Sequence, residues 1–214
     1  MRPWLILAAC VGLAAPAQAA PDFAGAVDRA IEGAILPAFD RFAVVGAAQA
    51  EAMAALCAAP GDAALGAARD AFADLVAAHG GIAPYRFGPM RAENRIERLF
   101  LWPDRRSRGL RQIQAALSTE DATVTTVARL QGKSVALQGL GALEFILFGD
   151  GAADLANAAG HRCAFGAAAA GAIAAVGADL AAAWRGPEGF ADVMRATGDD
   201  NPLYRSPDEA AREL

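Results

Sequence analysis

The sequence predicts an all-α protein built as an antiparallel helical bundle. Alanine, the residue with the highest helix propensity, makes up about a quarter of the 214 residues, whereas aromatic residues make up 7%. Apolar residues recur at helical spacing along most of the chain, and nowhere do apolar and polar residues alternate over more than a few positions. With 55% hydrophobic and 20% charged residues, the chain can bury the core of one domain or of two small ones.

The first 19 residues have the pattern of a secretory signal peptide. Arg2 supplies a positive charge, residues 4–13 form a short apolar run, and Ala17-Gln18-Ala19 fits the A-x-A cleavage pattern. We therefore expect export, with cleavage that leaves residues 20–214 as the mature helical domain. Such a protein would be periplasmic.

The three cysteines bear on both export and redox state. Leu7-Ala8-Ala9-Cys10 resembles a lipoprotein cleavage box, but the apolar run before Cys10 is short and continues past it, so ordinary cleavage is favoured. Cys57 and Cys163 remain in the mature chain. An exported protein can form a disulfide, but the sequence does not supply the geometry that a bridge needs. A disulfide and two buried free thiols therefore both stay open.

Two long helices are expected in the first part of the mature chain. Apolar residues recur every three or four positions over residues 23–42, and Pro37 should kink or restart that helix. A second helix is expected over residues 62–79, because Gly80-Gly81 favours a stop. His79 would end it, where the helix dipole favours a histidine, and this structural role is preferred to a ligand role.

The later helices follow a loop over residues 80–93 that is rich in glycine and proline. They are expected over residues 93–101, 107–117, 121–148 and 154–184. Ser107 is a candidate N-cap, and Ser118-Thr119-Glu120-Asp121 has the pattern of a capping box. A last helix should start at Ser206-Pro207. Because little chain follows that start, we expect the helical domain to be incomplete at its C-terminus.

The segment 135–148 is almost entirely apolar, with Gln138 and Glu144 as its polar residues. A helix that is apolar on all sides is typically buried, and this one is too short to span a membrane. We therefore expect Glu144 inside the bundle, where a carboxylate needs an ion pair, hydrogen bonds or a metal. The candidate ion-pair partners are Arg86, Arg95 and Arg98.

Several function classes lose support from what the sequence lacks. There is no H-E-x-x-H, C-x-x-C, C-x-x-C-H or G-x-S-x-G motif, which argues against common zinc proteases, c-type haem attachment and serine hydrolases. The net charge of −5 gives no basic surplus for nucleic acid.

One motif and its surroundings resemble a known family. Gly139-Leu140-Gly141-Ala142-Leu143-Glu144 resembles the G-x-H-x-x-E motif of the imelysin family. Further segments resemble the same family in the same order: Arg86-Phe87-Gly88-Pro89, Asn94-Arg95, Trp102-Pro103-Asp104, Gln138-Gly139, His161-Arg162-Cys163 and Asn201-Pro202-Leu203-Tyr204. The resemblance therefore spans most of the mature chain.

The resemblance implies an exported, all-helical protein associated with iron uptake. Imelysin-like proteins are built from two bundle-like halves with the motif near the interface of the halves, so this chain would be the first half. The family name comes from a peptidase assignment (M75), although many members are thought not to be peptidases. The partners implied are membrane components of iron uptake.

The sequence departs from the family motif at Gly141, which stands where the motif has histidine. A His and a Glu at i and i+3 share one helix face and form a sensible metal pair, but glycine has no side chain to donate. Glu144 is thus the metal-ligand candidate and needs further ligands; His161, in the next helix, could approach it. Candidate residues for binding a cofactor, iron or haem, are Arg86, Arg95 and Trp102, which lie in the family-like segments.

The sequence is compatible with three functions. The favoured hypothesis is a non-catalytic periplasmic protein for binding and uptake of iron or haem, with no nucleic-acid partner and no transmembrane span in the mature chain. The alternative is a structural or partner-binding helical domain without a metal. A metallopeptidase is less favoured, because that chemistry needs an open metal position, an activated water and a general base.

Overall fold

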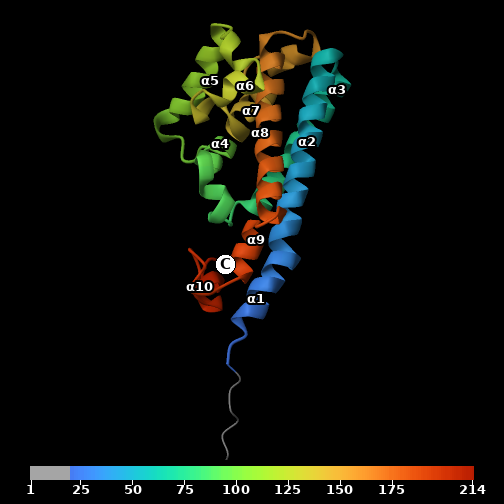
Figure 1. The fold of residues 1–214 in the computed structure, drawn as a ribbon. Coiled ribbons are helices and arrows are strands. Elements are labelled where there is room, and N and C mark those ends of the chain that lie inside the picture. The colour runs from blue at the N-terminus through green and yellow to red at the C-terminus, as the bar shows by residue number, and fades with distance from the viewer. Residues whose placement is uncertain (1–19) are drawn as a thin grey trace, which may run out of the picture.

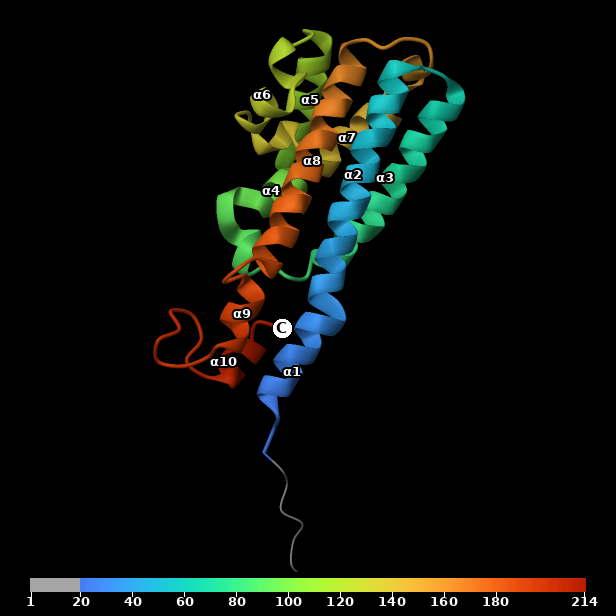
Figure 2. The ribbon, with the colours of Figure 1, turned by 45° about the vertical axis from the view of Figure 1, so that its right-hand side comes forward.

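The computed structural model describes residues 20–214, so the expected signal peptide and the alternative site at Cys10 lie outside the described residues. Residues 20–214 form helices and turns and contain no strand, which confirms the all-α prediction. Three long helices build the frame: α2 (Leu36–Ala58), α3 (Asp62–Ile82) and α8 (His161–Arg185). They lie side by side along the long axis, and α2 runs antiparallel to both of the others (Figures 1 and 2).

The first helix changes from α to π geometry just before Pro37, where the sequence predicts a kink or a restart. Helix α1 (Phe23–Ala30) passes through a π-helical turn (Ile31–Ile35) into α2. Proline lacks an N–H group and its ring crowds the carbonyl four residues earlier, here that of Gly33. The wider π turn at this point separates these groups and lets the chain continue as a helix.

Helix α8 is the core helix of the bundle. Glycine at its contact with α2 brings the two backbones close, because a Cβ added to Gly177 would lie 3.3 Å from the Cα of Ala43. Among residues 20–214, α8 alone is long and apolar enough to cross a membrane, with a mean hydropathy of 1.6. A buried helix has the same properties, and 61% of that stretch is buried here.

A disulfide joins α2 to α8 near the far end of the bundle. The sulfur atoms of Cys57 and Cys163 lie 2.01 Å apart, and their Cα atoms lie 5.6 Å apart. Of the two alternatives that the sequence left open, the structure contains the bridge. It ties α2 to α8 through two cysteines that are 106 residues apart in the chain.

The continuous helix expected over residues 121–148 is wrong. The structure has a 3₁₀ turn (Ala122–Val124), α6 (Val127–Gln131), a second 3₁₀ turn (Val135–Leu137) and α7 (Gly139–Phe148). Gly132 ends α6, and the Ser134 side chain caps the second turn. Gly139 has a φ of +73°, and a Cβ there would collide with backbone carbonyls at the end of α4 (Arg95–Leu99). This close approach sets the direction of α7.

Other helix boundaries also differ from the expectations. Helix α3 continues through Gly80-Gly81 to Ile82, since glycine is tolerated inside a helix at a cost of about 1 kcal/mol each relative to alanine. The short helix expected over residues 93–101 is reduced to α4, since the residues before it have left-handed backbone. Helix α8 begins at His161 rather than near residue 154, after a separate 3₁₀ turn (Ala152–Ala156).

The shorter helices fall into two groups around the frame. Helices α4, α6 and α7 pack against α8, and α5 (Arg108–Ser118) packs against α7, whereas α9 (Phe190–Arg195) and α10 (Pro207–Ala211) pack against α1 at the other end (Figure 1). The helix start expected at Ser206-Pro207 is thus present as the short α10. Arg195 links α9 to α1, because its Nε donates to the Asp28 carboxylate at 2.9 Å and its other nitrogen contacts Glu32.

Candidate functional site

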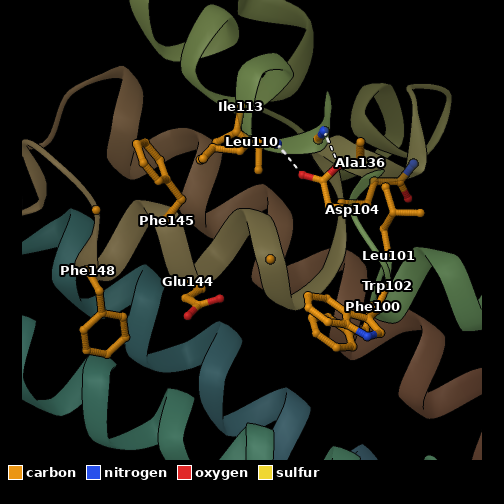
Figure 3. Close-up of a pocket in the computed structure, with 14 residues that line it drawn as sticks. Phe100, Leu101, Trp102, Asp104, Leu110, Ile113, Ala136, Glu144, Phe145 and Phe148 are labelled. Atoms are coloured by element: carbon orange, nitrogen blue, oxygen red, sulfur yellow. Dashed lines mark hydrogen bonds between the residues drawn. The ribbon is translucent and has the colours of Figure 1, made fainter. Parts of the chain in front are cut away.

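A pocket of about 420 Å³ opens between α7, α5 and the segment that follows α4 (Figure 3). Its walls are mainly apolar and aromatic. The residues that line it include Phe100, Leu101, Trp102, Asp104, Leu110, Ile113, Ala136, Gln138, Gly141, Glu144, Phe145 and Phe148. The family-like motif on α7 therefore forms one wall of this pocket.

Glu144 is exposed in the pocket, which corrects the expectation that it is buried inside the bundle. The core face of α7 is made by other residues, among them Leu143, Ile146 and Leu147, each with 0% exposure. The pocket-lining residues of α7 recur instead with the period of one helix face, from Gly141 through Glu144 to Phe148. The helix is apolar on all sides because its outer face lines a pocket.

No arginine pairs with Glu144 within residues 20–214, so the ion-paired hypothesis is wrong. Arg98 Nε donates to Gln138 Oε1 at 3.2 Å, and Arg95 donates to the carbonyl of Pro89 at 3.0 Å. Both arginines also approach Glu93. The carboxylate of Glu144 is therefore available to a ligand.

Gly141 leaves open space beside Glu144. A Cβ built on Gly141 meets nothing within 4 Å outside its own helix turn, in contrast to the crowded Gly139. Packing therefore does not require a glycine at the position where the family motif has histidine.

Two stacked rings form the wall of the pocket next to Glu144. The rings of Phe100 and Trp102 are nearly parallel, with 6° between their planes and 6.1 Å between their centroids. Trp102 is 74% exposed and Phe148 is 52% exposed. In Figure 3, the Glu144 carboxylate lies between Phe148 on one side and the stacked pair on the other.

His79 packs against Phe100 in this aromatic wall. Its ring makes edge contacts with Phe42, in the core, and with Phe100, at centroid distances of 6.1 and 5.9 Å. Burial lowers the pKa of His79, because the low-dielectric surroundings disfavour the charged ring. A structural role was preferred from the sequence, but as the end of the helix; α3 continues to Ile82, and the contacts of His79 are those of a packing residue.

The other polar groups of the pocket already have protein partners. Asp104 accepts hydrogen bonds from the backbone N–H groups of Gly109, at 2.9 Å, and Leu110, at 3.1 Å, and these bonds hold its pKa below the usual range. It therefore caps α5 in place of Ser107, whose side chain makes no capping bond. Gln138 accepts from Arg98 and donates to a backbone carbonyl at 2.9 Å.

The pocket residues by themselves do not fit a bare metal ion. Within residues 20–214, no group of three or more His, Cys, Asp or Glu side chains is arranged to hold one. His161, which the sequence allowed to approach Glu144, lines a separate pocket and contacts the carbonyl of Asp121 at 3.0 Å. Its neighbour Arg162 donates to the carbonyls of Phe145 and Ile146 and so holds the end of α7. A metal ion at Glu144 would need further ligands, either from a chelator or porphyrin that already holds it or from another part of the protein.

The structure places only some of the candidate site residues from the sequence in this pocket. Trp102 and Glu144 line the same pocket, but Arg86 is exposed on its loop and Arg95 is bound to Pro89, both outside the lining. Phe100, Phe145 and Phe148 were missed. The two on α7 share a helix face with Gly141, but an apolar helix gives no sequence signal for which face stays open.

Comparison with known proteins decides the family. The family described as imelysin, peptidase M75, matches residues 35–214. The chain belongs to the imelysin family. A solved structure with a similar fold is an imelysin-like protein from Psychrobacter arcticum 273-4, with a TM-score of 0.62 and 21% identity over 74% of this chain. No curated protein matches significantly.

This imelysin chain covers 48% of the Psychrobacter protein, so it spans about half of that protein's length. At this level of identity the likeness concerns the fold. The family resemblance noted in the sequence is thus confirmed.

Proposed function

We propose that this imelysin-family protein is an exported, non-catalytic binding protein of iron uptake, and that Glu144 contacts iron or haem in the pocket beside α7. The observation that carries the proposal is the exposed Glu144 carboxylate, which has no protein partner among residues 20–214 and faces an apolar pocket. Ligand sites are typically apolar hollows with a few polar groups. The partners would be membrane components of iron uptake.

Export to the periplasm has two sources of support. One is the signal-peptide pattern of residues 1–19. The other is the disulfide between Cys57 and Cys163, since such bridges persist in oxidising compartments.

The pocket supports binding better than catalysis. Metal-dependent peptide hydrolysis needs several metal ligands, an activated water and a general base, whereas the pocket offers one unpaired carboxylate. Glu144 would supply one oxygen ligand to iron, and the Phe100–Trp102 stack would pack against a porphyrin.

The alternative function is a partner-binding domain without a metal. The exposed rings of Trp102 and Phe148 are the observation that supports it. Exposed aromatic groups of this kind are common in protein interfaces.

Iron retention separates the two functions. The mature chain is incubated with ferric citrate or with haem and passed through gel filtration, and bound iron is measured by mass spectrometry. We expect retention by the wild type and by Glu51→Gln, an exposed carboxylate on α2 outside the pocket. Retention should fall about tenfold in Glu144→Gln. Equal retention in Glu144→Gln would exclude the site, and no retention by any protein would favour the partner-binding function.

A further inference from the structure

The pocket beside α7 presents one negative charge to whatever enters it. Asp104 is occupied by two backbone N–H groups, and Gln138 bonds to Arg98 and to a backbone carbonyl. Glu144 has no ion pair among the described residues and is exposed. A ligand therefore meets a carboxylate that has no cationic partner among the described residues, and a negative group placed beside Glu144 would be repelled.

Aromatic rings flank that charge on both sides. The nearly parallel Phe100 and Trp102 lie on one side of Glu144 and Phe148 lies on the other (Figure 3). The faces of aromatic rings attract cations and pack well against other rings. Phe148 already accepts one cation, because the guanidinium of Arg69 lies 5.3 Å from its ring centroid.

Arg69 forms no ion pair with Glu144 in the described part of the chain. Its Nε donates to the carbonyl of Leu147 at 2.9 Å, which directs it to the end of α7, and it does not line the pocket. The volume of about 420 Å³ suits a small molecule rather than a single ion.

From this arrangement we infer that the pocket binds a small aromatic ammonium compound, whose positive nitrogen pairs with Glu144 and whose ring packs against the stacked Phe100 and Trp102. A neutral aromatic compound would gain the packing without the charge pairing. A carboxylate of the same shape would meet repulsion. The inference goes beyond the proposed function and needs no metal.

A matched series of probes tests the charge preference. The probes are 2-phenylethylammonium, benzyltrimethylammonium, neutral 2-phenylethanol and anionic 3-phenylpropionate, titrated by calorimetry into the mature chain after treatment with a chelator. We expect both cations to bind about tenfold more tightly than the alcohol, and the anion to bind least.

Two pocket variants and one control variant locate the effect. Glu144→Gln should reduce the preference for the cations over the alcohol to about twofold or less, while Glu51→Gln keeps it. Trp102→Ala should weaken the cations and the alcohol alike. All three positions are exposed, and unchanged melting temperatures would verify folding.

The inference is overturned if the alcohol binds as tightly as the cations, if Glu144→Gln keeps the preference, or if no probe binds at millimolar concentration. Because the titrations use metal-free protein, these outcomes are independent of iron retention. A protein that fails to retain iron could still bind the ammonium probes, so each experiment tests its own proposal.

Discussion

Gly141 lies one helical turn before Glu144 on α7, and both residues line the same pocket. The resemblance noted in the sequence sets Gly141 against the histidine of the G-x-H-x-x-E motif. The space at this position is open, since a Cβ there meets nothing within 4 Å. This chain therefore lacks the histidine ligand of the motif, but the space for a side chain at position 141 is open.

Restoring the histidine should create metal affinity. We predict that Gly141→His binds Co²⁺ or Zn²⁺ at least about tenfold more tightly than the wild type, because His and Glu at i and i+3 share a helix face. Stability should be unchanged or slightly raised, since glycine is the poorer helix former by about 0.3 kcal/mol. Calorimetric titration and thermal melting measure both effects. Gly141→Ala controls for stability, and an affinity no higher than in that variant would contradict the prediction.

The two buried glutamines should respond in opposite ways to the same substitution. Gln49 is 0% exposed in α2, and neither its amide nitrogen nor its oxygen has a hydrogen-bond partner among residues 20–214. Leaving such a group unpaired costs about 1–3 kcal/mol. Gln49→Met should therefore raise the free energy of unfolding by about 1–2 kcal/mol in urea titrations.

Gln138→Met is the matched control. Gln138 is 4% exposed, but its amide is bonded to Arg98 and to the carbonyl of Lys133. Its replacement should lower the free energy of unfolding by about 1–3 kcal/mol, because both partners lose their bond. Destabilisation by Gln49→Met would show that its amide has a partner in solution.

His79 should make the fold sensitive to mild acid. Its pKa is lowered from 6.5 in the folded state by burial, so between the two pKa values the unfolded chain binds more protons. The contribution of neutral His79 to stability is complete above pH 6.5 and is lost as the pH falls towards the folded pKa. His79→Phe, which keeps the ring contacts with Phe42 and Phe100, should lose less stability between about pH 8 and pH 5 than the wild type.

Urea titrations at both pH values measure this difference. The two proteins differ at residue 79 alone, so the comparison isolates His79. Identical losses in the two proteins would contradict the role of its burial.

Removing the disulfide should destabilise the bundle. The bridge closes a loop of 106 residues between α2 and α8, which restricts the unfolded chain. Replacing both Cys57 and Cys163 by serine should lower the free energy of unfolding by about 2–4 kcal/mol. The unfolded, unreduced mature chain should also show no free thiol. Two reactive thiols, or an unchanged urea midpoint, would contradict the bridge.

The long helices could be predicted from the sequence because their apolar periodicity is local. The helix over residues 23–42 and its break before Pro37 both depend on neighbours within a turn. The break of the expected helix 121–148 was missed, because Gly132 and Ser134 are compatible with a helix interior at modest cost. They end the helix here because Gly139 must approach the end of α4, which is a tertiary contact.

The pocket was predicted only in part for a related reason. Glu144 was selected from the motif and Trp102 from a family-like segment, and both line it. An all-apolar helix, however, does not reveal which face meets the core, so Glu144 was expected to be buried. The pairing of Cys57 with Cys163 likewise depends on how α2 meets α8, which the sequence does not contain.

The most direct measurement of ligand binding in the pocket uses the two tryptophans of the mature chain. Trp102 is 74% exposed in the pocket and Trp184 is 0% exposed in the core, so their indole N–H signals report on separate places. In ¹⁵N-labelled protein titrated with ferric citrate or haem, we predict that the Trp102 signal broadens or shifts while that of Trp184 does not, and that Glu144→Gln abolishes the response. An unaffected Trp102 signal in the presence of bound iron or haem would contradict the pocket as the ligand site.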